Sequence, residues 1–214
     1  MGNAVYLFDF DGTLVDSMPH WSEKMLNILH QCGISGSVEL ISYIATLGDL
    51  GTAKYFREEL GVPYTVDRML QMMDDYALPK YCFEIPLKEG VREMLMAWKH
   101  AGIRLAVLTA SPHRMLDPCL KRLGVFDWFD YVWSTDDFGN SKNDPAIYGQ
   151  VADALGVTAK DITFFDDNLN AVRAAGRAGL RTVGVYDLSA EGCRRELEAA
   201  CDQYVLSFPE FRMD

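Results

Sequence analysis

Four short runs of apolar residues, each followed directly by polar residues, constrain the fold of this chain more than any other feature. The runs are continuous rather than alternating, they are rich in branched or aromatic side chains, and they cover residues 5–8, 103–108, 162–165 and 182–185. Continuous runs of this length are typical of strands that are buried on both faces of a parallel sheet. Weaker runs at 131–133 and 204–206 predict two further strands.

The segments between the later runs carry helical patterns. Ser111 precedes Pro112 and Asp144 precedes Pro145, which predicts helices that begin at these prolines after a capping side chain. Glycines that can end helices follow at Gly102, Gly124, Gly156 and Gly179. Strands and helices therefore alternate over residues 87–206, which predicts an α/β fold with a doubly wound, mainly parallel sheet and helices on both faces.

A long segment, residues 9–102, separates the first predicted strand from the second. A crossover through one helix needs about 30 residues or somewhat more, and the predicted helix 89–100 fills only a small part of the segment. Apolar residues in the remainder recur at helical spacing, and no period-two run occurs. We therefore expect a helical bundle at 17–85, inserted into a core formed by 1–16 and 86–214. It should overhang the carboxyl ends of the strands, where open parallel sheets bind ligands.

Glycines within the insertion predict a turn between two helical runs at residues 47–52. Polar residues in or beside such a turn can face a substrate. Asp49 and Lys54 are therefore candidates for substrate recognition, although polar groups at such positions are most often simply solvated.

Asp9 and Asp11 follow the first predicted strand, and Gly12 comes directly after them. Side chains two residues apart on an extended chain point to the same side, and a glycine lets the backbone turn sharply. A single aspartate after a strand often does no more than cap a turn. Two aspartates in this arrangement favour a functional site.

Polar residues also follow two other predicted strands, with Thr109 after the second and Asp166 with Asp167 after the third. Adjacent parallel strands would bring these groups and the two N-terminal aspartates to one edge of the sheet. Converging carboxylates repel one another unless a cation binds among them, and an all-oxygen site suits Mg²⁺. One of Asp166 and Asp167 is also expected to cap the helix that follows. Lys142 lies in a polar loop and, taken alone, is an ordinary surface lysine.

Taken in order, these elements resemble the motifs of the haloacid dehalogenase superfamily of phosphotransferases. Within this superfamily the chain resembles the helical-cap phosphatase branch, and it is similar to beta-phosphoglucomutase and phosphoglycolate phosphatase. Residues 9–13 resemble the first motif, Thr109 the second, Lys142 the third, and Asp166 with Asp167 the paired-acid form of the fourth. The resemblance covers essentially the whole chain. It implies a Rossmann-like catalytic core with the insertion as a helical cap.

The resemblance also implies an enzyme, namely a Mg²⁺-dependent phosphatase that hydrolyses small phosphomonoesters, with a sugar phosphate expected, through an aspartyl-phosphate. In this chain Asp9 would be the nucleophile and Asp11 the general acid and base. The implied metal-binding groups are the Asp9 side chain, the Asp11 backbone carbonyl and Asp167, with Asp166 in support. The implied phosphate-binding groups are the Thr109 hydroxyl, the Ala110 backbone N–H and the Lys142 ammonium.

Two alternatives remain beside the phosphatase. A phosphosugar mutase of the beta-phosphoglucomutase type would carry a histidine where this chain has Trp21, with His20 one place earlier, and this weakens the mutase interpretation. A receiver-like phosphoacceptor domain also uses an acid pair, a threonine and a lysine, but it has no large insertion. A further departure from the family pattern is Ser141, which stands where glycine is more usual.

Composition and charge bear on the partners of this chain. Lys and Arg number 20 against 31 Asp and Glu, and the net charge of −11 would repel nucleic acid and anionic membranes. No apolar stretch reaches the roughly 18 residues of a membrane span, and the N-terminus lacks a secretory signal pattern. The five cysteines are scattered without a C-x-x-C pair, which argues against a zinc site. We expect a cytoplasmic monomer whose partner is a small phosphorylated metabolite.

Overall fold

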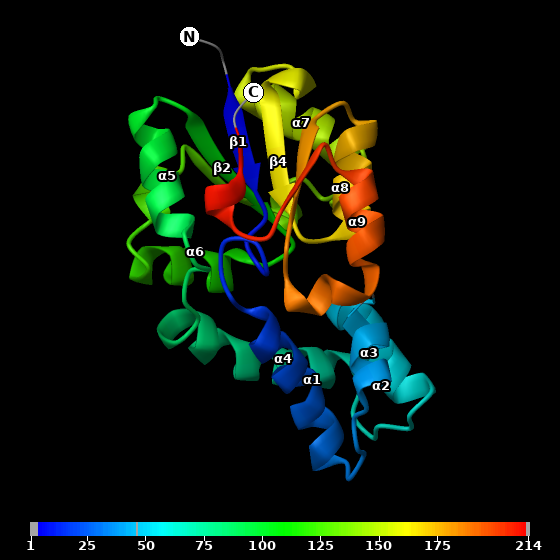
Figure 1. Ribbon diagram of the computed structural model, residues 1–214. Helices are drawn as coiled ribbons and strands as arrows, with labels where there is room; N and C mark the ends of the chain where they lie inside the picture. Colours follow the sequence, from blue (N-terminus) through cyan, green and yellow to red (C-terminus); the bar gives the residue numbers. More distant parts are fainter. Residues whose placement is uncertain (1–3, 46, 213–214) are drawn as a thin grey trace. The chain divides into compact units, whose positions relative to one another are not determined.

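The computed structural model describes residues 4–45 and 47–212 of the chain. The chain folds into two compact units (Figure 1). The first unit, which we call the sheet unit, comprises residues 1–16 and 86–214. The second, which we call the helical unit, comprises residues 17–85. Each unit encloses a hydrophobic cluster of its own.

Within the described residues, six parallel strands form the sheet, in the order β3-β2-β1-β4-β5-β6. The strands are β1 Val5–Phe8, β2 Arg104–Thr109, β3 Tyr131–Ser134, β4 Ile162–Asp166, β5 Arg181–Val185 and β6 Gln203–Val205. The predicted fold class is thus confirmed. Strand order reverses at β1, which lies between β2 and β4 (Figure 1). Phe8 is paired with Val107 on one side and with Phe165 on the other, so the carboxyl ends of the three strands share one edge.

Helices follow the strands in the sheet unit. They are α5 Val91–His100, α6 His113–Arg122, α7 Ala146–Leu155, α8 Leu169–Arg177 and α9 Arg194–Ala200, with short 3-10 segments at η1 Phe126–Trp128, η2 Thr135–Asp137, η3 Ala159–Asp161, η4 Leu188–Cys193 and η5 Phe208–Glu210. The prediction that Pro112 and Pro145 open their helices is wrong by one residue, because each precedes the first helical residue. The Asp144 side chain still caps, since it accepts a hydrogen bond from the Ala146 N–H at 2.9 Å.

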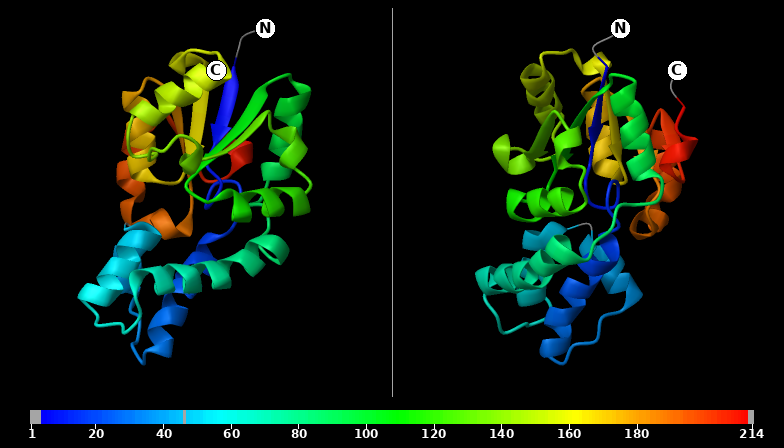
Figure 2. Two further views of the ribbon diagram at one scale, coloured as in Figure 1. Left: turned by 180° about the vertical axis from the view of Figure 1, so that it is seen from behind. Right: turned by 90° about the vertical axis from the view of Figure 1, so that its left-hand side faces the viewer.

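Alternate residues of β1 pack on opposite faces of the sheet. Val5 and Leu7 belong to a buried cluster to which α7 and α8 contribute Tyr148 and Ala171 among others. On the other face, Phe8 stacks on Phe165 with ring centroids 4.8 Å apart, and the aromatic cluster there extends to α5 and η5. Figure 2 shows α5 and α7 on opposite sides of the sheet. This double covering explains why the strand residues are continuously apolar.

The helical unit contains α1 Met18–Gln31, α2 Val38–Ala45, α3 Gly48–Glu58 and α4 Val66–Phe83. Its core consists of the apolar stripes of these helices, among them Met25, Ile28, Phe56, Met69 and Met73. The predicted turn at 47–52 is wrong, because α3 begins at Gly48 and continues through the segment. In the described part of the chain, no helix combines the length and the apolar character that a membrane span requires.

Candidate active site

Asp9 leaves the end of β1 and lies in the interior of the sheet unit. Its backbone N–H donates to the Phe165 carbonyl at 2.8 Å, which ties it to β4, and the residue is 5% exposed. Gly12 then turns the chain with a φ of +76°. A Cβ atom at this glycine would lie 2.6 Å from Oδ2 of Asp167. Both the backbone angle and the close approach therefore require glycine here.

Asp166 and Asp167 end β4 beside this turn. Asp166 is fully buried, and its Oδ1 accepts from the Asn168 N–H at 2.7 Å. Asp167 accepts at Oδ1 from the Thr13 hydroxyl at 2.8 Å. Asn168 caps α8, since its side chain accepts from the first amides of the helix. The expectation that one of the two aspartates caps this helix is therefore wrong, and both point to the acid cluster instead.

Three buried carboxylates meet at this edge of the sheet. One oxygen from each of Asp9, Asp166 and Asp167 lies within 4.8 Å of the others, the one such group among the described residues. Lys142 reaches the group from the loop before α7, with Nζ 2.5 Å from Asp9 Oδ1 and 2.7 Å from Asp166 Oδ2. One ammonium cannot balance three carboxylates. Hard oxygen donors with excess negative charge fit a divalent cation such as Mg²⁺.

The electrostatics of the cluster follow from burial. Desolvation raises the pKa of Asp9 from 3.8 to about 7; Lys142 opposes this shift, and Asp166 and Asp11 add to it. Burial and then the charge of Asp166 raise the pKa of Asp167 well above its ordinary value. Burial lowers the pKa of Lys142, but Asp166 and Asp9 together outweigh it, so the pKa of the ammonium lies above its ordinary range. Lys142 therefore stays charged, while the acids need a further positive charge to ionise fully.

The end of β2 supplies hydroxyl groups. Thr109 is buried, and its Oγ1 accepts from the Ser111 N–H at 3.1 Å. Ala110, between them, is exposed. The Ser111 hydroxyl donates to Oδ2 of Asp11 at 2.5 Å, which links this loop directly to the turn after β1. The prediction that Ser111 caps α6 is wrong, because Pro112 is the N-cap residue and no side chain caps the helix. The sequence analysis gave Ser111 no role in the site, although its position two residues after Thr109 would place it at the same end of β2.

The loop that carries Lys142 is held by Tyr148 of α7. The Tyr148 hydroxyl lies 2.9 Å from the Lys142 carbonyl and 3.1 Å from the Ala171 carbonyl, and the side chain is fully buried. Sequence reasoning missed this residue too, because a tyrosine on the apolar face of a helix looks like ordinary core. Of the site residues predicted from the sequence, Asp9 and Asp166 are both in direct contact with Lys142.

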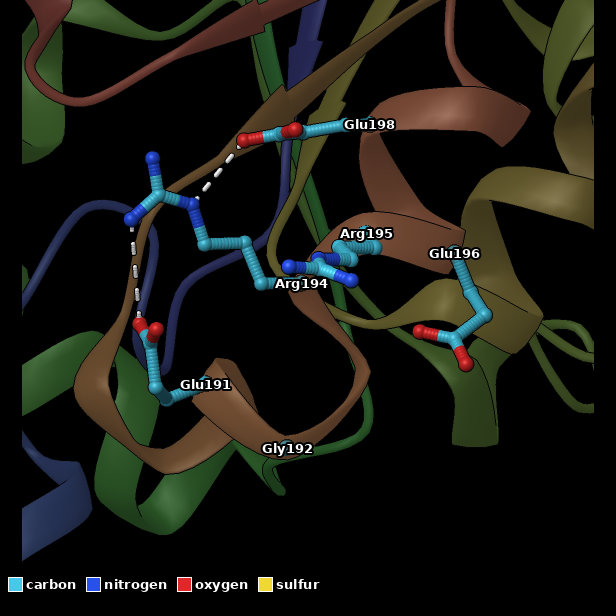
Figure 3. Close-up of a pocket in the computed structure, with 6 residues that line it drawn as sticks. All are labelled: Glu191, Gly192, Arg194, Arg195, Glu196 and Glu198. Carbon is cyan, nitrogen blue, oxygen red and sulfur yellow. Dashed lines mark hydrogen bonds and ion pairs between the residues drawn. The ribbon is translucent and has the colours of Figure 1, made fainter.

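A pocket elsewhere on the sheet unit is lined by charged residues of η4 and α9 (Figure 3). Its lining residues are Glu191, Gly192, Arg194, Arg195, Glu196 and Glu198. Arg194 lies between two acids, with Nε 2.9 Å from Glu198 and a terminal nitrogen 4.0 Å from Glu191 (Figure 3). None of the predicted site residues lines this pocket. Among its charged residues, Arg194 pairs with two acids of the same pocket.

Comparison with known proteins gives consistent results. A family model described as haloacid dehalogenase-like hydrolase matches residues 4–179. The chain is 29% identical over 179 residues to a phosphorylated carbohydrates phosphatase of Thermotoga maritima, covering 83% of this chain and 82% of the relative. It is 27% identical over 190 residues to hexitol phosphatase B of Escherichia coli K12, covering 84% of this chain and 82% of the relative.

A solved structure is similar over nearly the whole chain. This is a Thermotoga maritima protein designated a candidate beta-phosphoglucomutase, with 26% sequence identity and a TM-score of 0.75. The match covers 94% of each chain. The similarity therefore spans both units of the chain and is not confined to the sheet.

Proposed function

The chain belongs to the haloacid dehalogenase-like hydrolase family and is a phosphoric monoester hydrolase, and we propose that it hydrolyses small sugar phosphates through a covalent aspartyl-phosphate on Asp9. The observation that carries the proposal is the buried contact of Lys142 with Asp9 and Asp166. A fixed cation beside a carboxylate at the end of a central strand suits attack on an anionic phosphoryl group. Family membership excludes the receiver alternative.

Asp9 is the proposed nucleophile. Its carboxylate oxygen forms a bond to phosphorus while the bond from phosphorus to the sugar oxygen breaks. Attack requires the ionised carboxylate, and the Lys142 ammonium at 2.5 Å favours that form. The bond between the Asp9 N–H and the Phe165 carbonyl fixes the backbone, so little orientation has to be gained on binding.

Asp11 is the proposed general acid and base. It gives its proton to the departing sugar oxygen, and it then takes a proton from the water that attacks the aspartyl-phosphate. This attack breaks the bond between the Asp9 oxygen and phosphorus, which releases inorganic phosphate and restores the carboxylate. The hydrogen bond from Ser111 to Oδ2 of Asp11 supports this role, because it orients a carboxylate that is otherwise carried on a turn. Ser111 is in this sense a positioning residue.

Three groups are proposed to hold the phosphoryl oxygens. They are the Thr109 hydroxyl, the Ala110 backbone N–H and the Lys142 ammonium. Thr109 ends β2, and the Lys142 carbonyl accepts a hydrogen bond from the Tyr148 hydroxyl, so the backbone that carries two of the three groups is hydrogen-bonded to neighbouring elements. Donors that are aligned before the reaction stabilise the charge that develops in the transition state.

Asp9, Asp167 and the Asp11 backbone carbonyl are proposed to hold Mg²⁺, with Asp166 in support. The buried carboxylates of Asp9, Asp166 and Asp167 lie close enough together to bind one ion. They offer only oxygen atoms, which are the ligands that Mg²⁺ prefers. When bound, the ion neutralises negative charge on the transferring group. The Thr13 hydroxyl orients Asp167 for this task, and Lys142 orients Asp166.

The helical unit, 17–85, is proposed to be a cap that recognises the sugar and excludes bulk water. Its insertion directly after the catalytic turn supports this, since the chain leaves the sheet unit at Asp16 and returns at Pro86. A phosphosugar mutase remains the second candidate, favoured by the similarity to the Thermotoga maritima protein. A mutase would isomerise its substrate only when supplied with a sugar bisphosphate, whereas a phosphatase releases phosphate without one.

The Asp11→Asn variant tests the proposal. A nitrophenolate leaves without an acid, but hydrolysis of the aspartyl-phosphate still needs a base, which asparagine cannot provide. With nitrophenyl phosphate and Mg²⁺ we expect a burst of about one equivalent of nitrophenol per enzyme, followed by slow turnover. Intact mass after acid quench should show one added phosphoryl group, and a sugar phosphate should give little burst.

The Asp9→Asn variant is the matched control, since it should give neither burst nor phosphorylated protein. A burst in Asp9→Asn would remove the nucleophile assignment. Wild-type hydrolysis at full rate in excess chelator would remove the metal from the proposal. If Asp11→Asn hydrolyses a sugar phosphate as fast as the wild type does, Asp11 is not the acid.

A further inference from the structure

Lys88 lies where the chain returns to the sheet unit. The returning segment pairs with the departing one: the Lys88 N–H donates to the Leu14 carbonyl, the Asp16 N–H donates to the Pro86 carbonyl, both at 3.0 Å, and an antiparallel bridge joins Val15 to Leu87. The turn that carries Asp11 is therefore joined by backbone hydrogen bonds to residues that come much later in the sequence.

The Lys88 ammonium has three oxygen partners. Its Nζ lies 2.6 Å from the Gly12 carbonyl, 2.7 Å from the Tyr186 carbonyl and 2.8 Å from Oδ2 of Asp187. An ammonium has three protons, so these partners use all of its donors. Asp187 is itself 7% exposed, and its other oxygen accepts from the N–H and the hydroxyl of Ser189. The lysine is thus fixed at its far end as well.

The Gly12 carbonyl lies at the centre of the turn after β1. The same peptide unit continues into Thr13, whose hydroxyl holds Asp167, and the Gly12 N–H donates to the Val15 carbonyl. We infer that Lys88 is a positioning residue, which holds the Asp11–Thr13 turn against the end of β5 and so sets the direction of Asp11 and Thr13. This inference rests on the proposed function for its catalytic meaning.

The set of acceptors favours this inference over a simple stabilising ion pair. An ion pair would need only Asp187, whereas two of the three acceptors here are backbone carbonyls from different elements. Hydrogen bonds from a charged donor are stronger than those from a neutral donor. The bond to Gly12 acts on a residue whose φ of +76° only glycine adopts readily, at the point where Asp167 approaches most closely.

The experiment compares three variants. Lys88→Met keeps an unbranched side chain of nearly the same length but removes its charge and donors, whereas Lys88→Arg keeps both the charge and the donors. Lys99→Met is the matched control, because Lys99 is an exposed lysine that also donates to a backbone carbonyl, that of Trp128 at 2.7 Å. Each is assayed for kcat and KM with Mg²⁺ and a sugar phosphate, and for amide hydrogen exchange of the segment 9–15.

In Lys88→Met we expect kcat to fall at least tenfold with KM changed less than threefold, and the amides of Gly12, Leu14 and Val15 to exchange faster. Lys88→Arg should recover part of both, and Lys99→Met should change neither. Unchanged exchange at these amides overturns the inference. So does faster exchange with unchanged kcat, since the turn would then be held without consequence for the reaction.

The two readouts separate this inference from the proposed function. If the wild type released no phosphate from any phosphomonoester, the proposed function would fail, and hydrogen exchange would still decide whether Lys88 holds the turn. If Lys88→Met does not fold, Lys88→Arg and Lys88→Gln carry the test. Slower exchange and higher kcat in Lys88→Arg than in Lys88→Gln support the need for a charged donor. Equal exchange and equal kcat in the two variants overturn it.

Discussion

The two units of this molecule bury different kinds of side chain. The interior of the sheet unit contains the carboxylates Asp9, Asp166 and Asp167, with Lys142 at 11% side-chain exposure beside them. The interior of the helical unit is an apolar cluster. Among its described residues, Lys24 is the one buried charge, and it pairs with Asp49 at 2.7 Å.

This difference has a physical meaning. Burying an ionised group costs several kcal/mol unless its partners replace the hydrogen bonds and the charge stabilisation that water provided. The single positive charge of Lys142 cannot neutralise the negative charges of three carboxylates. A fold that needed only stability would fill the same space with apolar residues, as the helical unit does. We therefore infer that the charges in the sheet unit serve the proposed reaction, and we expect the two units to respond to mutation in opposite ways.

Replacing Lys142 by methionine should lower activity by more than any single substitution in the helical unit does. Methionine fills similar space but cannot donate, and one aligned donor to developing charge contributes about 3 kcal/mol to the transition state. We expect kcat/KM to fall by about 100-fold, measured as phosphate release with Mg²⁺. Lys160→Met, an exposed lysine of η3, is the control and should change kcat/KM less than twofold. A loss of less than threefold in Lys142→Met would make Lys142 an ordinary lysine.

Asp9→Asn should raise the stability of the metal-free protein, and more so at higher pH. Because burial lifts the pKa of Asp9 to about 7 from 3.8, the folded state prefers the protonated form. Relative to a neutral side chain, the cost of ionised Asp9 is absent below about pH 4 and grows until about pH 7. Above pH 7 the variant should be more stable than the wild type by at least about 2 kcal/mol, because the raised pKa of Asp9 already includes the favourable contact with Lys142.

Urea unfolding in chelator at pH 4.5 and pH 8 measures this difference. Asp153→Asn, an exposed aspartate of α7, should show no change between the two pH values. Excess Mg²⁺ should narrow the gap, because the ion stabilises only the folded wild type. A gap that shrinks as the pH rises would contradict the assignment of Asp9 as a carboxylate destabilised by burial.

Much of this contrast could be predicted from the sequence. The strands were predictable because double burial leaves continuous apolar runs, and the same pattern placed Asp9, Thr109 and Asp166 at strand ends. The motif residues then followed from their order along the chain. The turn predicted at 47–52 does not form: of the two glycines in this segment only Gly48 has a positive φ, and Gly51 lies within α3.

The missed residues act through contacts that no local pattern reveals. Lys88 reaches Gly12 and Asp187, which are far away in sequence in both directions. Tyr148 looks like core, and only its hydroxyl contact with the Lys142 carbonyl distinguishes it. Capping by Asn168 rather than by an aspartate depends on where β4 ends, and boundaries of elements are less well determined by sequence than the elements themselves.

The smallest effects should occur at the ion pair of the helical unit. Lys24 keeps 9% of its side chain exposed and Asp49 keeps 37%. In Lys24→Met the remaining carboxylate can be solvated and methionine suits the apolar surroundings, so the free energy of unfolding should change by no more than about 0.5 kcal/mol. In Asp49→Asn the buried ammonium loses its charged partner, and the loss should reach about 1 kcal/mol. Urea unfolding of both variants measures this order, while kcat should stay within threefold in each. If Lys24→Met proved the more damaging of the two, the helical unit would depend on its buried charge, and the contrast with the sheet unit would not hold.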